Sequence, residues 1–175
     1  MDHSAFDAYA YLIQTEGKSV LYSGDFRDHG RKSKSFYWFL YNTPDNIDVL
    51  LLEGTSFGRE GYEYPSENKM ERSMLKISKN TEGLLLFQQS SQNIDRIVSF
   101  YKAALRSDRL FVIDIYTAQL LSTLKKYADI PYPSREFSNL KVFYPHWLRK
   151  RIIREGHKGL LKKFRDFKIK HDEIT

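Results

Sequence analysis

The pattern of hydrophobic and polar positions predicts β structure in the first part of the chain. Residues 8–14 and 19–25 are apolar-rich and flank a short connection that contains Gly17, which is typical of a β-hairpin. The bulky apolar patch at residues 35–42 is expected to form one or two helical turns. Residues 47–55 begin with a continuous apolar run, as in a strand that is buried on both faces.

After a polar loop at residues 56–69, the apolar positions follow the period of a helix. Met70, Met74 and Ile77 fall on one helical face, and Ser66 is a suitable N-cap. The pattern then predicts, in order, a buried strand at 83–89, a helix from near Ser91, a strand at 109–116, a helix around 120–124, a proline-rich bend at 129–134, a strand at 141–145 and a helix from His146. Strands and helices that alternate with short connections indicate parallel strands, and therefore an α/β unit.

Composition narrows the class of protein. With 175 residues, 41% of them hydrophobic, the chain can bury one good core or two small ones. It has no cysteine, so disulfides and thiolate metal sites are excluded. No apolar run approaches the ~20 residues that span a bilayer. The N-terminus carries an acid where a signal peptide carries positive charge. A cytoplasmic location is therefore the expectation.

The net charge of +6 is unevenly distributed. Residues 149–170 hold ten Lys or Arg and two acids, which leaves 18 basic and 20 acidic residues in the rest of the chain. A basic face of this kind suits an anionic partner such as nucleic acid, although the solvated face of a lysine-rich helix is an equally good interpretation. The candidate nucleic-acid contacts in this segment are Arg149, Arg151, Arg154, Lys158 and Lys162. Arg96, one turn into the helix after Ser91, is a sixth candidate, and simple N-capping explains that helix start as well.

Three motifs carry a resemblance to a known family. The segments DHSAFDAYAYLI, VLYSGDFRDHGRK and DVLLLEGTSFGRE occur in the order and spacing of the metallo-β-lactamase fold hydrolases. The later segment LLLFQQSSQNIDRIVSFYKAALRSDRLFVIDIYTAQLL resembles the β-CASP cap domain of the ribonuclease J-like branch. The resemblance implies a partial metallo-β-lactamase β-sandwich element at residues 1–55, followed by a parallel-sheet α/β cap domain at residues 66–175 with a basic C-terminal helix.

The resemblance also implies a metal-dependent site. In this family two zinc ions are bound at the mouth of the β-sandwich, where they activate water and stabilise the charge that develops on a phosphodiester. His3 matches an isolated histidine ligand, Asp25 the aspartate that bridges the metals, and Glu53 the acid that lies next to the metal site. Asp25 and Glu53 are therefore the catalytic candidates, and His3 and Asp25 the metal ligands. Without the resemblance, each is an ordinary terminal, turn or strand-end residue.

The chain departs from the family at the remaining ligands. The His-x-His-x-Asp-His motif precedes the position of His3 in the family and is absent here, and no segment resembles the family's C-terminal histidines. The scattered His29, His146, His157 and His171 do not restore a ligand set. We therefore expect the middle part of a zinc-dependent, ribonuclease-like hydrolase that is inactive and binds no stoichiometric zinc as an isolated chain. The alternative is a non-catalytic nucleic-acid-binding or protein-interaction module. RNA is the expected partner, and self-association or a partner chain is expected to cover residues 1–55.

Overall fold

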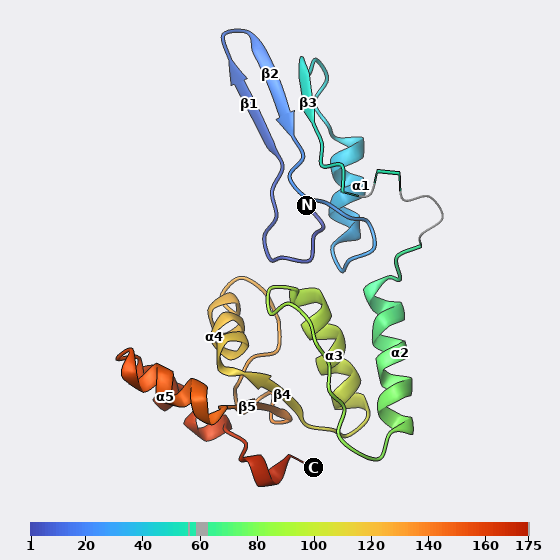
Figure 1. Cartoon of the computed structure of the whole chain (residues 1–175). Coiled ribbons are helices and arrows are strands. Elements are labelled where there is room, and N and C mark those ends of the chain that lie inside the picture. The colour runs from blue at the N-terminus through green and yellow to red at the C-terminus, as the bar shows by residue number, and fades with distance from the viewer. Residues whose placement is uncertain (56, 59–62, 175) are drawn as a thin grey trace. The chain divides into compact units, whose positions relative to one another are not determined.

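The first two strands form the predicted hairpin in a computed structural model that describes residues 1–55, 57–58 and 63–174 (Figure 1). Strand β1 (Tyr11–Thr15) pairs antiparallel with β2 (Lys18–Tyr22). The two residues between the strands, Glu16 and Gly17, have φ angles of 48° and 75°. Positive φ at both positions is what a two-residue type I′ turn requires, and this turn matches the natural twist of the strands. The hairpin prediction is confirmed.

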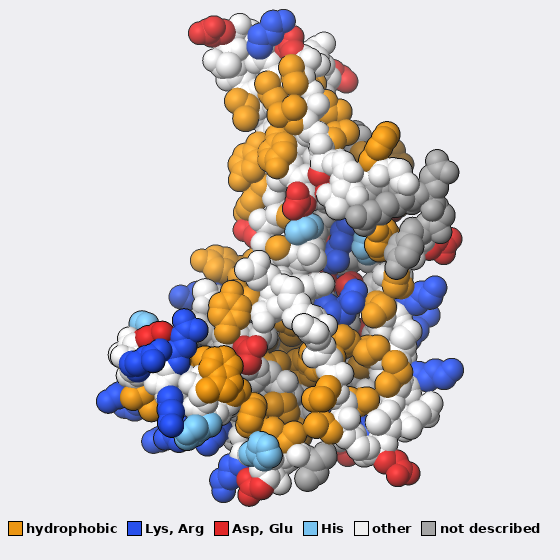
Figure 2. Space-filling view, viewed as in Figure 1, with side chains coloured by type: hydrophobic (Ala, Val, Ile, Leu, Met, Phe, Trp, Pro, Cys, Tyr) orange, Lys and Arg blue, Asp and Glu red, His pale blue; other side chains and the backbone are white. Residues whose placement is uncertain are grey.

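Strand β3 (Val49–Leu51) pairs parallel with β2, so the sheet has the order β1-β2-β3. The strand was predicted, but its burial on both faces is wrong, because Val49, Leu50 and Leu51 are each about half exposed. An apolar run predicts a strand with two apolar faces, but it does not identify the part of a protein that would cover those faces. Figure 2 shows apolar side chains in the part of the molecule that Figure 1 assigns to these strands.

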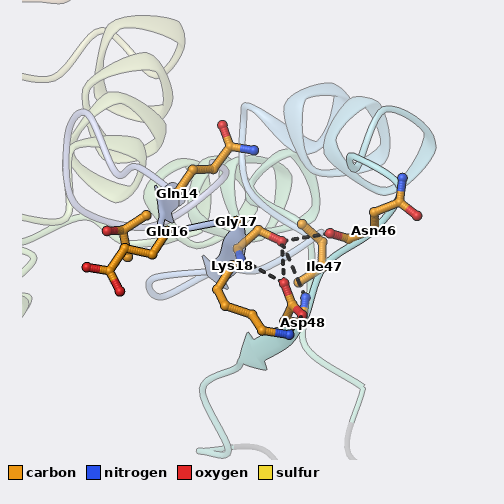
Figure 3. Close-up of a pocket in the computed structure, with 9 residues that line it drawn as sticks. Gln14, Glu16, Gly17, Lys18, Asn46, Ile47 and Asp48 are labelled. Carbon is orange, nitrogen blue, oxygen red and sulfur yellow. Dashed lines mark hydrogen bonds and ion pairs between the residues drawn. The ribbon is translucent and has the colours of Figure 1, made fainter.

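Asp48 joins the start of β3 to the hairpin (Figure 3). Its carboxylate accepts hydrogen bonds from the backbone N–H of Ser19 at 2.8 Å and from Nζ of Lys18 at 2.7 Å. These bonds lower the pKa of Asp48. The hydroxyl of Ser19 donates to the carbonyl of Asn46 at 2.6 Å. The polar hollow at the tip of the hairpin is therefore lined by groups that already bond to one another.

The predicted helical turns at the apolar patch form α1 (Ser33–Tyr41). Helix α2 (Glu67–Asn80) begins at the predicted cap, since Ser66 Oγ accepts the N–H of Lys69 at 3.3 Å. Of the polar loop before this helix, Gly61 lies outside the described residues, and Gly58 has a φ of 76°.

The second half of the chain has the predicted alternation of helices and parallel strands. It contains α3 (Ile94–Arg106), β4 (Phe111–Asp114), α4 (Ile115–Leu124) and β5 (Leu140–Phe143), and β4 pairs parallel with β5. The most buried apolar side chains from these elements are Ile97, Ala118, Leu121, Leu140 and Val142. The predicted strand at 109–116 is shorter than expected, because Asp114 accepts the N–H of Thr117 at 2.7 Å and caps α4.

The prediction of a buried strand at residues 83–89 is wrong. The segment has no strand assignment, and Leu84 and Leu86 are 51% and 87% exposed. Phe87 holds the segment in place by side-chain contacts instead: its ring stacks on Phe111 and packs against Phe100. Together with β4, the segment borders a largely apolar cavity of about 740 Å³. Periodicity cannot decide whether an apolar run forms a hydrogen-bonded ladder or packs through its side chains alone.

The predicted C-terminal helix is divided in two. Helix α5 (His146–Arg154) ends before Gly156, whose φ is 81°, and α6 (Lys158–Lys163) follows. Two short 3₁₀ turns, Arg165–Phe167 and His171–Glu173, complete the described chain. No helix in the described ranges is long and apolar enough to cross a membrane.

The contacts divide the chain into two units. Unit 1 comprises residues 1–70 and 92–95, and unit 2 comprises 71–91 and 96–175. Helices α2 and α3 therefore each begin in unit 1 and continue into unit 2. The buried residues of the two units differ in kind. Unit 2 has the apolar core given above, whereas buried residues of unit 1 include Asp2, Ser23, Glu67 and Asp95.

Candidate functional site

The loop that follows β2 begins with a close backbone approach. Gly24 has a φ of 60°, and a Cβ at this position would lie 2.4 Å from the carbonyl oxygen of Tyr9. Only glycine fits such a position without displacing backbone. The neighbouring Ser23 is fully buried, and its N–H donates to the carbonyl of Leu51 at 3.0 Å. The end of β2 is thereby held between Tyr9, which precedes β1, and Leu51, the last residue of β3. Asp25 is the next residue along the chain after Gly24.

His3 and Asp25, the two predicted metal ligands, are brought together. Nε2 of His3 lies 3.8 Å from Oδ2 of Asp25. The backbone N–H of Ala5 donates to Nδ1 of His3 at 3.2 Å, so a neutral His3 ring carries its proton on Nε2, the atom that faces Asp25. The Asp25 side chain is 64% exposed and that of His3 is 28% exposed. The pair is therefore accessible from solvent.

Glu53, the third residue of the predicted site, binds the backbone beside this pair. Its Oε1 accepts the N–H of Phe26 at 2.9 Å. Because Phe26 directly follows Asp25, Glu53 positions the loop that presents the Asp25 carboxylate. The ring of Phe26 in turn stacks on Phe36 of α1, with centroids 5.4 Å apart. The three sequence-predicted residues thus come to the same end of the sheet.

These residues do not make a complete zinc site by themselves. A structural zinc ion takes four protein ligands and a catalytic one at least three, and no group of three His, Cys, Asp or Glu among the described residues is arranged to hold a metal. His29 does not join the pair: its ring stacks on Tyr64 with centroids 5.3 Å apart, and its Nδ1 lies 3.5 Å from Asp28. By themselves, His3 and Asp25 form a histidine–carboxylate contact of 3.8 Å, which provides two of the ligands that a zinc ion needs.

Sequence reasoning missed the buried ion network beside the site. The side chain of Arg27 is only 12% exposed and lies among three carboxylates. Its guanidinium bonds to Asp95, and it is 3.7 Å from Asp2 and 3.8 Å from Glu67. Asp2 and Glu67 are almost completely buried. The only sequence signal was the charge density of residues 25–32, which is equally typical of a solvated turn.

The loop backbone completes this network. The N–H of Gly30 donates to Oδ2 of Asp2 at 2.8 Å, and the N–H of Arg31 donates to Oδ2 of Asp95 at 3.0 Å. The backbone N–H of Arg27 donates to the carbonyl of Asp2 at 2.8 Å. Asp95 lies in the first turn of α3 and Glu67 in the first turn of α2. The network therefore holds the starts of both helices against the loop that carries Asp25.

The predicted nucleic-acid contacts lie on three different helices. Arg149, Arg151 and Arg154 are on α5, Lys158 and Lys162 are on α6, and Arg96 is in the first turn of α3. Figure 2 shows Lys and Arg side chains gathered at the lower left, where Figure 1 places α5. Arg151 bonds to Glu155 at 2.8 Å, which raises the pKa of the guanidinium and lowers that of the carboxyl.

A further lysine belongs to this basic region. Nζ of Lys163 donates to Oε1 of Gln119 at 2.8 Å. Burial lowers the pKa of Lys163, and the charge of Lys125 at the end of α4 lowers it further. Lysines that repel one another at a surface favour the approach of an anion.

Comparison with known proteins shows weak sequence similarity to ribonuclease J. The chain is 27% identical over 112 residues to ribonuclease J of Mycoplasma genitalium, which is 62% of this chain and 20% of that protein. It is 25% identical over 150 residues to ribonuclease J of Helicobacter pylori strain 26695, which is 82% of this chain and 22% of that protein. The chain thus spans about a fifth of the length of these relatives. No protein family model matches.

One solved structure shares the fold. A protein of unknown function from Enterococcus faecalis V583 superposes with a TM-score of 0.56 at 19% sequence identity, covering 93% of this chain and 48% of that one. At this identity the likeness concerns the fold alone. The chain is therefore an α/β protein with weak homology to ribonuclease J over part of its length.

Proposed function

We propose that this chain is the central part of a zinc-dependent metallo-β-lactamase fold hydrolase of the β-CASP, ribonuclease J-like branch, which acts on RNA or another phosphodiester in the cytoplasm. Residues 1–55 would supply a segment of the sandwich, and residues 66–175 the cap domain. The observation that carries the proposal is the pairing of His3 with Asp25 at 3.8 Å, in a chain that is similar to ribonuclease J over 150 residues.

In the complete hydrolase the described residues would have distinct roles. His3 and Asp25 would hold metal, and Glu53 would keep the Asp25 loop in position through its bond to Phe26. Bound zinc would supply an activated water and charge stabilisation at the phosphodiester. Because His3 and Asp25 are two ligands and such a centre needs at least three, we propose that the isolated chain is inactive and that further ligands complete the centre.

The contribution proposed for unit 2 is RNA binding through the basic region of α5 and α6. Residues 149–170 carry eight more basic than acidic side chains, and Arg149, Arg154, Lys158 and Lys162 are all exposed. Phosphate contacts of this kind release counterions, so that affinity falls steeply as salt rises. The arrangement supports binding to the RNA backbone, independent of catalysis.

The test is RNA binding by the full chain, measured by fluorescence anisotropy with a labelled single-stranded RNA across a range of salt concentrations. We expect affinity to fall steeply with salt, and to fall further when Lys158 and Lys162 are both replaced by Glu. The matched control replaces Lys76 and Lys79, two exposed lysines of α2, by Glu as well, so that the net charge changes by the same amount. Absence of binding at low salt would contradict the proposal, as would an equal loss in the control.

A second candidate function, a non-catalytic interaction module, is favoured by the exposed apolar surface of unit 1. Ile13, Leu50 and Leu51 are half exposed, and Trp38 and Tyr41 of α1 are 66% and 85% exposed. Burial of one such side chain stabilises an assembly by ~1.5–3 kcal/mol, so we propose that residues 1–55 self-associate or bind a partner chain. Light scattering that shows a monomer at tens of micromolar would argue against self-association.

A further inference from the structure

Helix α5 presents an exposed tryptophan beside exposed basic residues. Trp147 is 65% exposed, whereas Ile152 on the other side of the helix is only 7% exposed. Large aromatic side chains are usually buried at least in part, because each carries a large apolar area. Among the described residues, no ring packs against the indole of Trp147. Its exposure therefore leaves one aromatic face available to a ligand.

The spacing along α5 places two cations on the same side as this indole. Lys150 and Arg154 follow Trp147 at i+3 and i+7, and residues so spaced share one face of a helix. At 1.5 Å per residue, the three positions span about 10 Å of the helix axis. Both cations are exposed, and the charge of Arg154 helps to lower the pKa of its neighbour Glu155. We call Trp147, Lys150 and Arg154 the α5 face.

The other arginines of α5 are placed differently. Arg149 lies about 160° around the helix from Arg151 and outside the α5 face. Arg151 borders this face, but its guanidinium bonds to Glu155 at 2.8 Å. The α5 face is therefore a defined subset of the basic region, with its own aromatic residue and two exposed cations.

An aromatic plane flanked by cations matches the chemistry of an unpaired nucleotide. A base stacks on the indole, and the neighbouring phosphates contact Lys150 and Arg154. Paired bases are already stacked within a duplex and do not offer this contact. A lipid surface is a poorer match, because an interfacial helix inserts a broad apolar face, and here Ile152 is buried in the fold.

We propose that the α5 face binds single-stranded RNA by stacking one unpaired base on Trp147 while Lys150 and Arg154 contact the adjacent phosphates. The proposal rests on the proposed function, in which the chain acts on RNA, and specifies the form of RNA and the residues that contact it. According to this proposal, α5 binds single-stranded RNA selectively, whereas a general basic surface would attract any polyanion.

The chain contains two tryptophans, which provide a matched pair of variants. Trp38 on α1 is exposed to the same degree as Trp147, at 66%. We expect Trp147→Ala to weaken binding of a labelled oligoadenylate by at least about fivefold and Trp38→Ala to leave it unchanged. Binding of a duplex RNA of equal length should be unaffected by either change. In a Trp38→Phe background, oligoadenylate should also quench the emission of Trp147.

The two cations are tested by the salt dependence of the same binding. Each of Lys150→Gln and Arg154→Gln should reduce the slope of log affinity against log salt by about 0.7, whereas Lys76→Gln, at an exposed lysine of α2 outside the basic region, should leave it nearly unchanged. Salt-dependent binding that Trp147→Ala does not weaken, or whose salt slope Lys150→Gln and Arg154→Gln both leave unchanged, would overturn this inference and leave the proposed RNA binding intact. Absence of RNA binding at low salt would overturn both.

Discussion

The backbone N–H of Gly30 donates to the buried carboxylate of Asp2 at 2.8 Å, and the two residues are so close that a side chain on Gly30 has no space. A Cβ on Gly30 would lie 2.2 Å from Oδ1 of Asp2 and 2.6 Å from Nε of Arg27. The loop that carries Asp25 can therefore pack on the N-terminal segment only because position 30 is glycine.

Replacing Gly30 by Ala should destabilise unit 1. The added methyl group must push apart Asp2 and Arg27, and overpacking of this kind typically costs about 1–3 kcal/mol. Urea unfolding measures the change. Gly159→Ala is the control, because a Cβ there meets nothing within 4 Å, and alanine is the better helix former. Equal stability of Gly30→Ala and the unchanged chain would show that Asp2 and Arg27 are not packed as described.

Replacing Arg27 by Met should be more damaging. The change keeps much of the side-chain volume but leaves Asp2, Glu67 and Asp95 without their common cation. Removal of one partner from a buried ion network costs about 3–5 kcal/mol. Arg165→Met is the matched control, because Arg165 and its neighbour Asp166 are both largely exposed, and such pairs contribute little. Urea unfolding measures both variants. If Arg27→Met lowers the free energy of unfolding no more than Arg165→Met does, the buried ion network is contradicted.

The isolated chain should bind no stoichiometric zinc and show no nuclease turnover. His3 and Asp25 provide two candidate ligands, and two do not form a tight zinc site. Elemental analysis after dialysis against zinc measures the metal content, with His3→Ala as the comparison. One tightly bound zinc ion per chain that is lost in His3→Ala would contradict this prediction and show that the described residues suffice.

Tyr144 should make stability fall at alkaline pH. Its side chain is buried, its hydroxyl has no hydrogen-bond partner among the described residues, and burial raises its pKa to about 12 from an ordinary 10. Because folding favours the neutral phenol, its contribution is complete below pH 10 and is lost as the pH rises towards 12.

The comparison is with Tyr144→Phe, which cannot ionise. At pH 7 the variant should be as stable as the unchanged chain or up to about 1 kcal/mol more stable, because it removes an unpaired buried hydroxyl. Between pH 10 and 12 its advantage should grow. Thermal unfolding at several pH values measures this, and an advantage that shrinks with pH would contradict the burial of the hydroxyl.

The sequence predicted most of the local elements, because hairpin, helix and strand signals are local. The family resemblance named His3 and Asp25 as candidate ligands of one site, and their role there stays a prediction. It could not predict the Arg27 network, whose partners at positions 2, 67 and 95 are far apart in the chain. It also could not predict the exposure of β3 or the missing strand at 83–89. Both depend on which surfaces meet in three dimensions, and an apolar run carries no information about that.

The Arg27 network also constrains the order in which the chain can fold during synthesis. Arg27 and Asp95 are separated by 68 residues, and contacts so distant in sequence form late because a long loop must close first. The hairpin of β1 and β2 can form as soon as it leaves the ribosome, whereas unit 1 cannot close until the start of α3 has emerged. During that interval Arg27 lacks its partner on α3, and translation at ~5–20 residues per second makes the interval last several seconds. A nascent chain paused before residue 95 should therefore be the form most in need of a chaperone.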